Sequence, residues 1–380
     1  MKKLLFLQVS SVLLHNAGHK RASRYYEELY RLKDGYEKND HFWELPLWVV
    51  EIDGYLDGIM DTSFRLIDNC EPLEDVDDFD YILFSITDAN KGHVRNFAQQ
   101  YQGRAEILTG GYNTVEGLKF FDSPKALAEY LGVPYKYALN YKHFKGTHTI
   151  PRITLSTGCR SNCKFCVTQH WLELTPSENI LHQAEQMARA LEFKFAYVAD
   201  STFGQADNHT LLQEAHKIIK RYNPKFEGFI IQTSAAQLNK PGFIESLPGL
   251  GVRVVEMGME SFNDHILRSL DKPASEKMIR NAVTRLHEHG LKIILNVITG
   301  LMGEDARSYR HTYDFIYESR EKLYAMNIYT LAIYPGKEYG KPVTKRPLMD
   351  LETGRKDDHQ YFYERIFELG TEILHIDTIV

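Results

Sequence analysis

Short apolar runs alternate with amphipathic segments through the first 145 residues of the chain. The runs that predict β-strands lie at 3–9, 45–53, 80–87 and 105–111. The segments that predict helices lie near 20–33, at 93–101 and at 123–132. Apolar strands that alternate with helices are typical of a parallel sheet covered on both faces. We therefore expect a small doubly wound α/β domain over residues 1–132, with any ligand site at the C-terminal ends of its strands.

The same alternation starts again after residue 150. Apolar runs that predict six further strands lie at 152–156, 195–200, 228–234, 252–258, 292–299 and 326–334. Helical segments separate them, and one of these, at 275–290, has Gly290 as a stop signal. Six strand–helix units fall short of a complete eight-stranded barrel, which typically needs about 250 residues. The pattern therefore predicts a partial (β/α)6 TIM barrel over residues 151–338.

Two segments fit neither pattern. Residues 133–150 are aromatic and basic without a clear period, which indicates a surface linker between the two domains. Residues 339–380 form a C-terminal extension in which 358–374 predicts a helix. The apolar run that follows the first lysines is also compatible with a signal peptide. A buried first strand is favoured, because no small-x-small cleavage pattern follows the run.

Composition narrows the class of protein. The chain has 380 residues, 43% of them hydrophobic, and a formal charge of −6, which suits a soluble globular protein of two or three domains. The mild acidity gives no general attraction to nucleic acid, so a nucleic-acid partner is not expected. No apolar run reaches the roughly 20 residues of a membrane helix. Four cysteines, three of them clustered, do not make a disulfide framework, and close reduced thiols indicate a cytoplasmic protein.

The clustered cysteines lie in STGCRSNCKFC (156–166) and follow the strand predicted at 152–156 directly. Cys159, Cys163 and Cys166 therefore lie on a loop at the C-terminal strand face, where barrel enzymes build their active sites. An iron–sulfur cluster normally takes four thiolates, so three would leave one iron with an exchangeable position.

A structural zinc site is the alternative, with His170 or Cys70 as the fourth ligand. Zinc sites usually use two separated pairs of ligands, and the chain has no second pair. Cys70 falls in the other predicted domain, where it is interpreted as an isolated thiol.

The C-x3-C-x2-C spacing, with Phe165 before the last cysteine, resembles that of the radical S-adenosylmethionine enzymes. In that family the open iron of a 4Fe–4S cluster chelates the amino and carboxylate groups of S-adenosylmethionine. An electron from the cluster then cleaves the sulfonium bond to give a 5′-deoxyadenosyl radical. The resemblance implies that Cys159, Cys163 and Cys166 bind the cluster and that Phe165 belongs to the S-adenosylmethionine site.

Later segments follow in the order that this family shows. They are VADSTFG (198–204), the segment from EMGMES (256–261) through the lysine-containing turn, VITGLMGED (297–305) and YPGKEYG (334–340). Two of these segments depart from the family pattern, with Met302 in place of proline and Lys337 in place of threonine.

The resemblance also assigns roles by position. Glu260 and Ser261 would approach the ribose or amino acid part of S-adenosylmethionine, and Asp200 would do similar polar work after the second barrel strand. Gly300 and Gly303 would let the backbone approach the adenine. The structural alternative for each acidic residue is a helix N-cap or a solvated turn.

A Rossmann-like domain before the barrel resembles the cobalamin-binding branch of the family, many of whose members are methyltransferases. In LLHNAG (13–18), His15 and Gly18 match the end of the D-x-H-x-x-G cobalamin motif, with Leu13 where aspartate is expected. The other candidate cobalamin positions, at predicted strand ends, are Ser85, Gly110 and Gly111.

These resemblances imply cobalamin-dependent methyl transfer to an unactivated carbon of a small molecule or peptide, with an electron donor such as flavodoxin or ferredoxin. A radical enzyme without cobalamin, which abstracts hydrogen or catalyses a rearrangement, is the alternative. Methylthiolation is disfavoured, because that branch needs three further N-terminal cysteines and only Cys70 lies there. Non-enzyme alternatives are a zinc-binding or a cobalamin-binding module. The sequence identifies no catalytic acid or base and no particular substrate.

Overall fold

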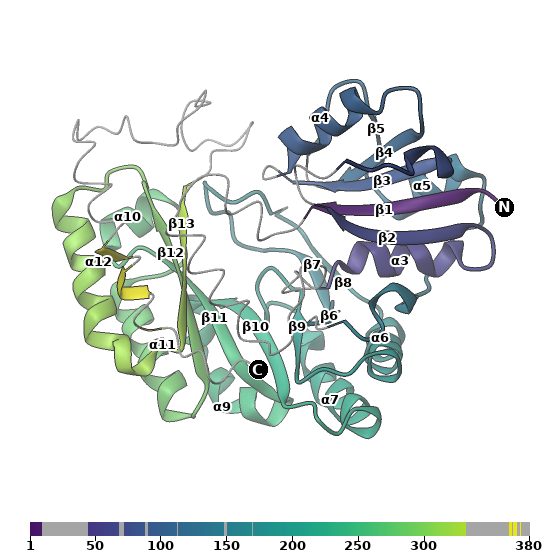
Figure 1. The fold of residues 1–380 in the computed structure, drawn as a ribbon. Coiled ribbons are helices and arrows are strands. Elements are labelled where there is room, and N and C mark those ends of the chain that lie inside the picture. The colour runs from purple at the N-terminus through teal and green to yellow at the C-terminus, as the bar shows by residue number, and fades with distance from the viewer. Residues whose placement is uncertain are drawn as a thin grey trace. The chain divides into compact units, whose positions relative to one another are not determined.

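The chain divides into two compact units, which are described separately (Figure 1). The computed structural model describes residues 1–9, 45–67, 72–87, 90–111, 113–147, 150–168, 170–331, 365–366, 368–370 and 373. The first unit comprises Met1–Pro151 and Gln186–Phe193, and the second comprises Arg152–Glu185 and Lys194–Val380. The helix expected near 20–33 and the segment 334–340 lie outside the described residues.

The first unit contains a five-stranded sheet in the order β2-β1-β3-β4-β5, in which all described pairs are parallel. Its strands are β1 (Lys3–Val9), β2 (Asp61–Ile67), β3 (Tyr81–Ile86), β4 (Glu106–Gly111) and β5 (Lys119–Phe120). Its helices are α3 (Leu47–Leu56), α4 (Lys91–Gln100) and α5 (Pro124–Leu131), with 3-10 turns η2 (Val76–Asp78) and η3 (Lys142–Phe144). The strands predicted at 3–9, 80–87 and 105–111 are confirmed, as are the helices predicted at 93–101 and 123–132.

Alternate residues of β1 pack on opposite faces of this sheet. Leu5 and Leu7 belong to a core that includes Phe97 of α4. Phe6 points to the other face, where its ring centroid lies 5.8 Å from that of Trp48 in α3. Because side chains alternate along a strand, an apolar run such as that of β1 can be buried on both sides.

The prediction of a strand at 45–53 is wrong, because this run forms helix α3. Seven of the ten residues of α3 are buried, including Asp53 and Gly54, so no periodic polar face distinguishes it from a buried strand. The pattern of apolar residues did not predict β2, in which only Thr62 and Ile67 are buried. β2 lies at the edge of the sheet, where a mixed polar sequence is tolerated.

In the described part of 133–150, which was expected to be a surface linker, most side chains are exposed or half-buried. Tyr141 and Phe144 are buried. Asp53, which is fully buried in α3, accepts a hydrogen bond from Thr62 and lies 3.4 Å from the ammonium of Lys142. The ordering of this segment therefore follows from contacts with α3 and β2, which its aromatic and basic composition did not reveal.

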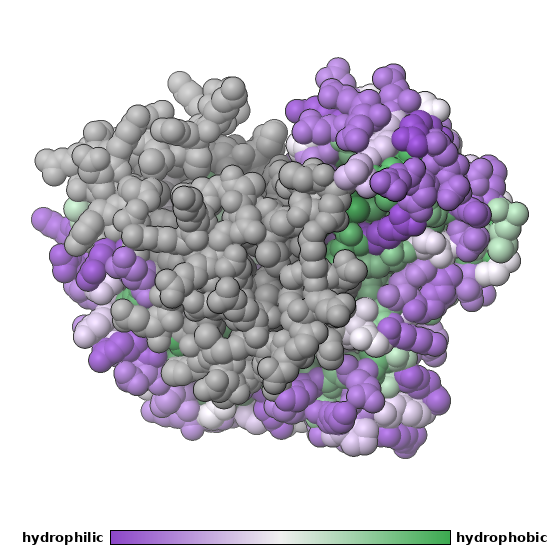
Figure 2. Space-filling model, in the orientation of Figure 1, coloured by the Kyte–Doolittle hydropathy of each residue, from purple (hydrophilic) through white to green (hydrophobic). Residues whose placement is uncertain are grey.

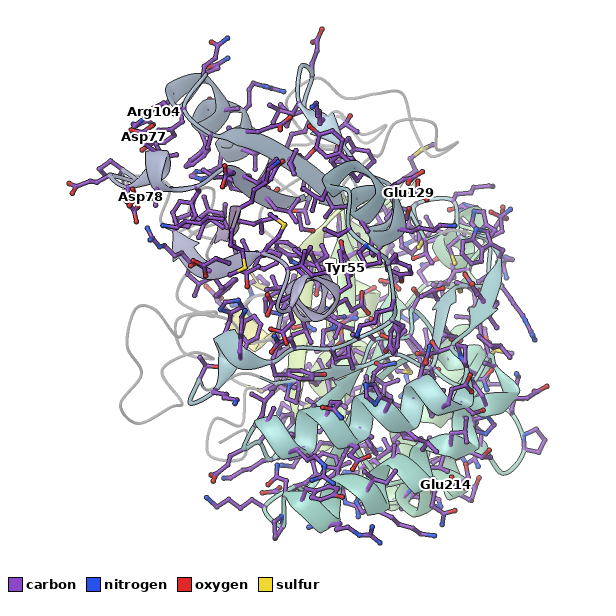
Figure 3. The ribbon with its side chains drawn as sticks, turned by 90° about the vertical axis from the view of Figure 1, so that its right-hand side faces the viewer. Tyr55, Asp77, Asp78, Arg104, Glu129 and Glu214 are labelled. Carbon is purple, nitrogen blue, oxygen red and sulfur yellow. The ribbon has the colours of Figure 1, made fainter. Side chains whose placement is uncertain are left out.

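Aromatic packing joins the same segment to α3. The rings of Tyr55, labelled in Figure 3, and Tyr135 lie 5.5 Å apart between centroids. Burial raises the pKa of the Tyr55 phenol, so this side chain stays neutral.

The surface of the first unit carries charged residues that contribute little to stability. Asp77 and Arg104 lie together in Figure 3, and the Arg104 Nε atom donates to an Asp77 oxygen at 2.8 Å. Exposed pairs of this kind contribute about 0–1 kcal/mol. Figure 2 shows mostly hydrophilic residues on the visible surface around α4. Among the helices described for this chain, none has both the length and the apolar character of a membrane span.

The second unit contains a six-stranded sheet in the order β13-β12-β11-β10-β9-β6, again with all described pairs parallel. Its strands are β6 (Arg152–Ile153), β9 (Phe195–Val198), β10 (Gly228–Ser234), β11 (Val252–Glu260), β12 (Lys292–Thr299) and β13 (Ala325–Thr330). All six predicted strands are therefore confirmed, although the first is shorter than expected. The end of its predicted range instead starts β7 (Ser156–Gly158), which pairs antiparallel with β8 (Leu172–Leu174).

Capping side chains mark the helices that follow residue 151. The helices are α6 (Ser177–Ala190), α7 (Leu211–Tyr222), α8 (Ala235–Leu238), α9 (Phe243–Ser246), α10 (Asp264–Ser269), α11 (Glu276–Glu288) and α12 (Ala306–Ser319). The 3-10 turns are η4 (Asp207–Thr210), η5 (Leu247–Leu250) and η6 (Arg320–Lys322). Ser275 caps α11 and Asp305 forms a capping box with Ser308 at the start of α12. The described residues of the tail, within 365–373, are helical, as predicted.

A polar network crosses one face of this second sheet. Glu256 of β11 accepts hydrogen bonds from the Tyr197 hydroxyl at 2.7 Å and from the Asn296 amide at 2.7 Å. Asn327 of β13 donates to Glu256 at 3.2 Å and to Asn296 at 3.0 Å. A buried carboxylate is tolerated when several donors satisfy it, so this network fixes the relative positions of four strands.

Two helical glycines of the first unit provide a matched stability test. A Cβ atom on Gly54 of α3 would lie 2.1 Å from the carbonyl oxygen of Ala138, whereas a Cβ atom on Gly92 of α4 would meet nothing within 4 Å. We expect Gly54→Ala to lower the free energy of unfolding by about 2–3 kcal/mol through overpacking. Gly92→Ala should raise it by about 0.5 kcal/mol, because alanine favours the helix. Urea unfolding of the full chain checks both, and equal effects would contradict the close packing of α3.

Candidate functional site

The cysteine loop, residues 159–168, begins where β7 ends and leads toward β8. β7 and β8 pair from Ser156 with Leu174 to Gly158 with Leu172, so the hairpin holds the two ends of the connecting segment together. Gly158 has a φ of +83°, a conformation that favours glycine and that turns the chain into the loop. The three cysteines of the loop, all of them free, are therefore presented from one anchored segment.

The three thiols lie within electrostatic reach of one another. The pKa of the Cys163 thiol is raised to about 11, chiefly by burial. Lys272 opposes this rise, and charge on Cys166, Glu260 or Cys159 adds to it. Burial also raises the pKa of Cys159, but hydrogen bonds from Thr202 and Ser161 outweigh burial, so the net pKa is lowered. Thiolates that repel one another in this way are stabilised by binding a metal group.

The donor set fits an iron–sulfur cluster better than a single ion. In the described ranges, no three His, Cys, Asp or Glu side chains converge closely enough to hold one metal ion. A 4Fe–4S cluster instead needs one thiolate on each bound iron, which three neighbouring cysteines can supply. His170, considered above as a zinc ligand, is exposed and its Nδ1 atom lies 2.9 Å from the Ser161 carbonyl oxygen. Cys70 lies outside the described residues.

Asp200 holds the backbone that leads into the cysteine loop. One of its carboxylate oxygens accepts from the N–H groups of Leu155 and Ser156, both at 2.9 Å, and the other accepts from the Ser156 hydroxyl at 2.6 Å. Burial raises the pKa of Asp200, and these hydrogen bonds oppose the increase without cancelling it. All these contacts are within the protein, so the predicted contact of Asp200 with S-adenosylmethionine stays a prediction.

Glu260 ends β11 and is ion-paired inside the unit. Its Oε1 atom lies 2.7 Å from the Nζ atom of Lys272, and both side chains are nearly buried. The register of β11 against β12 shifts between Gly258 and Glu260, and Glu260 has a φ of +64°. The bulge therefore turns the Glu260 carboxylate out of the regular strand alternation.

Ser261 is the residue after Glu260, but its side chain has different neighbours. It is fully buried, and its hydroxyl lies 3.5 Å from that of Thr312 in α12. The Thr312 hydroxyl also accepts from the N–H group of Phe262 at 3.0 Å. The structure thus brings Ser261 against a helix, and its predicted contact with S-adenosylmethionine is untested.

Gly300 and Gly303 flank a turn after β12 in which both have left-handed backbone, with φ of +83° and +81°. The Glu304 carboxylate accepts from the N–H groups of Gly300 and Leu301, both at 2.9 Å. Burial raises the pKa of Glu304 to about 8, although the hydrogen bonds from Tyr309 and this backbone oppose the rise. Glu304 therefore fixes the shape of the turn whose open backbone was predicted to face adenine.

Phe165 is half-buried beside the cysteines. It packs on a small apolar cluster whose buried members are Ile266, Leu270, Leu301 and Leu331. This group of apolar side chains packs the cysteine loop against α10 and against the turn after β12. This packing shields the loop from water on one side.

Three of the positions predicted for cobalamin lie together in the first unit. Ser85 pairs with Gly110, and Ile86 with Gly111, at the C-terminal ends of β3 and β4. Gly111 has a φ of +101°, and a Cβ atom there would lie 2.6 Å from the Ile86 carbonyl oxygen, so only glycine fits. His15 and Gly18 lie outside the described residues.

Sequence reasoning did not single out Lys272, Thr202 and Glu304, which contact Glu260, Cys159 and Gly300, respectively. Lys272 was noticed only as part of a lysine-containing turn. Its partner Glu260 lies twelve residues earlier on a different element, so the spacing in the sequence does not reveal their pairing. The G-x-x-x-E pattern of Gly300 and Glu304 was a usable signal, because a carboxylate four residues after a glycine can accept from that turn's backbone.

Asp200 offers a test of the anchoring of the cysteine loop. We expect Asp200→Ala to lower the free energy of unfolding by about 3 kcal/mol, because it leaves buried donors without an acceptor. Asp200→Asn should cost about 1 kcal/mol, since its carbonyl oxygen can still accept from Leu155 and Ser156. Urea unfolding of the metal-free protein checks the difference. Equal losses in the two variants would show that the backbone hydrogen bonds to Asp200 contribute little.

Comparisons with known proteins agree with this geometry. The family model described as Radical SAM superfamily matches residues 153–316. The chain is also similar to bacteriochlorophyllide d C-12(1)-methyltransferase of Chlorobaculum tepidum, with 26% identity over 241 residues, 60% of this chain and 50% of the relative. The chain therefore spans about half the length of this curated relative.

Solved structures with a similar fold include those of two proteins, TsrM and OxsB. The radical S-adenosylmethionine methyltransferase TsrM from Kitasatospora setae, with cobalamin and a [4Fe-4S] cluster bound, has a TM-score of 0.58 at 12% identity, covering 95% of this chain and 84% of TsrM. The cobalamin-dependent S-adenosylmethionine radical enzyme OxsB, with aqua-cobalamin and S-adenosylmethionine bound, has a TM-score of 0.56 at 14% identity, covering 100% of this chain and 58% of OxsB. At these identities the likeness concerns the α/β fold alone. The part of the chain that matches the Radical SAM model, residues 153–316, contains the whole cysteine loop.

Proposed function

We propose that this protein is a radical S-adenosylmethionine enzyme that catalyses cobalamin-dependent methyl transfer to an unactivated carbon of a small molecule or peptide. The observation that carries the proposal is the anchored loop on which Cys159, Cys163 and Cys166 lie within electrostatic reach of one another. The methyltransferase relative and the fold shared with TsrM and OxsB support the cobalamin branch.

The proposed domain organisation follows the two units. A Rossmann-like, cobalamin-binding-like domain covers 1–132, and a linker follows at 133–150, whose described part packs with the first unit. A partial (β/α)6 TIM barrel covers 151–338, and a helical extension covers 339–380. The strand order β2-β1-β3-β4-β5 supports the first assignment, because it is an order found in doubly wound folds that bind ligands at their C-terminal strand ends.

The chemistry belongs to the bound groups, and the chain supplies the surroundings. When bound, the cluster and S-adenosylmethionine supply one-electron cleavage of a sulfonium bond, and cobalamin supplies a carrier for the methyl group. The cysteine thiols lose their protons on binding the cluster. Phe165 and its apolar cluster exclude water beside the loop, which strengthens charge interactions there.

The residues that would contact S-adenosylmethionine come from several segments of the second unit. Glu260 and Ser261 would approach the ribose or amino acid part, and Asp200 would support them from the end of β9. Gly300 and Gly303 would admit the adenine against the turn that Glu304 holds. A glycine with left-handed backbone has no side chain to keep a ligand at a distance, which supports this assignment.

For cobalamin we propose a site at the C-terminal ends of β3 and β4, lined by Ser85, Gly110 and Gly111. His15 and Gly18 belong to the same proposed site on the basis of their sequence motif. The place of these residues at the C-terminal ends of parallel strands supports the proposal, because doubly wound folds bind ligands there.

The proposed partners are a small-molecule or peptide substrate and a one-electron donor such as flavodoxin or ferredoxin in the cytoplasm. TsrM has been solved with tryptophan as its substrate, which supports a substrate of small size. The alternative proposal, a radical enzyme that works without cobalamin, keeps the same cysteine loop and loses only the role of the first unit.

Anaerobic reconstitution tests the cluster. We expect the wild-type chain to bind about four iron and four sulfide ions with a broad absorption band and to cleave S-adenosylmethionine after reduction. Cys159→Ala should abolish both properties, because one iron loses its thiolate. Cys70→Ala is the matched control and should retain both. Bound zinc without sulfide, or cleavage that survives in Cys159→Ala, would refute the assignment.

Cobalamin binding has its own test. We expect the wild-type chain to change the corrin absorption spectrum when titrated with hydroxocobalamin. Ser85→Leu should weaken binding about tenfold or more, because its larger side chain fills the edge beside Gly111. Circular dichroism checks that the variant is folded. A wild-type chain that leaves the corrin spectrum unchanged would favour the enzyme without cobalamin and would not affect the cluster assignment.

A further inference from the structure

Lys272 is a cation held inside the second unit beside the cysteine loop. Its side chain is 10% exposed, and its ammonium lies 2.7 Å from the Glu260 carboxylate, which is 8% exposed. Long charged side chains are seldom buried to this extent unless they are paired or functional. The contact with S-adenosylmethionine proposed above for Glu260 does not account for its pairing with Lys272.

Both halves of this pair are held by unusual backbone. Glu260 has a φ of +64° and Asp271, directly before Lys272, has a φ of +53°. In the part of the chain that the structure describes, these two are the only non-glycine residues with positive φ. Such conformations persist where the surrounding structure enforces them, and they concentrate at functional sites.

The turn that carries Lys272 is fastened to the segment between two of the cysteines. The N–H group of Lys164 donates to the Leu270 carbonyl oxygen at 2.9 Å, and its ammonium donates to the Ser269 carbonyl oxygen at 3.2 Å. The Lys272 ammonium lies 5.9 Å from the centroid of the Phe165 ring. Lys272 is therefore fixed relative to the loop that presents Cys163 and Cys166.

The charge of Lys272 acts on the sulfur atoms. Burial lowers the pKa of Lys272, but the carboxylate of Glu260 and the thiols of Cys163 and Cys166 outweigh burial and raise it, so the ammonium stays charged. Since charge interactions are poorly screened in a buried site, the pair contributes a fixed field at the cysteines.

The space around the pair is also filled. A Cβ atom on Gly258 would lie 2.6 Å from the Glu260 Oε1 atom and 2.9 Å from the Lys272 Nζ atom. The chain therefore has a glycine where any side chain would displace the ion pair.

We propose that Lys272 and Glu260 are positioning residues that set the reduction potential of the cluster, with Lys272 favouring the reduced state and Glu260 opposing it while it holds Lys272 in place. The proposal rests on the proposed function, because it requires a cluster bound by the three cysteines. When the cluster accepts one electron its net charge becomes more negative, so a nearby buried cation stabilises the product.

Potentiometric titration of the reconstituted full chain tests this proposal. Dithionite supplies the electron, and electron paramagnetic resonance measures the reduced cluster without S-adenosylmethionine. We expect Glu260→Gln to make reduction more favourable than in the wild type. The double variant with Glu260→Gln and Lys272→Met should then have an equilibrium constant for reduction at least tenfold lower than Glu260→Gln alone. For a one-electron couple this corresponds to a reduction potential lower by about 59 mV. Lys272→Met alone is less informative, because it leaves an unpaired buried carboxylate that takes up a proton.

Two controls separate the charge from its position. Lys272→Arg in the Glu260→Gln background keeps the cation and should leave the potential near that of Glu260→Gln. Lys164→Met in the same background removes a cation that is one-third exposed, and solvent screening should make its shift clearly smaller. Equal shifts from Lys164→Met and Lys272→Met would overturn the proposal.

The remaining outcomes are also decisive. If the double variant binds no cluster, Glu260→Gln against the wild type decides, and an unchanged or lowered potential overturns the proposal. A wild-type cluster whose potential is the same in all variants overturns this inference and leaves the proposed function standing. A wild-type chain that assembles no cluster refutes the proposed function, and the role of Lys272 with it.

Discussion

The candidate site depends on how the cysteine loop is tied to the buried end of the sheet. Asp200 follows β9 directly and accepts three hydrogen bonds from Leu155 and Ser156, just before the loop. On the far side of the cysteines, the N–H group of Thr175 donates to the Leu155 carbonyl oxygen at 2.9 Å. Both ends of the loop therefore converge on one short stretch of backbone. Without that anchor the three thiols would be independent groups on a long connection, and ordering them would cost conformational entropy on binding a metal group.

Charge balance is the second requirement of the site. The three cysteines, which would lose their protons on binding a cluster, and the Glu260 carboxylate would bring negative charge into one region of the second unit. Lys272 is a nearly buried cation that pairs with Glu260 there. The polar network around Glu256 applies the same rule elsewhere on the sheet with neutral donors in place of a cation. The second unit therefore stabilises its buried carboxylates in two ways. Neutral donors surround Glu256, whereas the charged Lys272 pairs with Glu260 near the cysteines.

Much of the fold could be predicted because strand pattern and cap residues are local signals. The six strands of the second unit were recognised from apolar runs, and α11 from a helical segment with Gly290 as its stop signal. Cys159, Cys163 and Cys166 were predicted as cluster ligands from their spacing and from the family resemblance that the later segments support. What failed was non-local: α3 and a buried strand have the same apolar composition, and β2 has the mixed sequence of an edge strand. The ion pair between Lys142 and the buried Asp53 joins two segments that no local pattern connects.

The candidate site shows the same limit. Residues that belong to motifs were named in advance, but their environments were not. Ser261 and Glu260 are adjacent in the sequence, yet one faces Thr312 on a helix and the other faces Lys272. A register shift between Gly258 and Glu260 precedes both residues. A one-residue change of register reverses the direction of every side chain that follows, and the sequence carries no simple sign of it.

Gly258 limits how this site can change by mutation. It carries no charge and touches no proposed ligand, yet its missing side chain is the room in which the Glu260–Lys272 pair lies. Mutation at this position therefore acts on the electrostatics of the site without altering any charged residue. Among related chains, Gly258, Glu260 and Lys272 should therefore be retained together or replaced together.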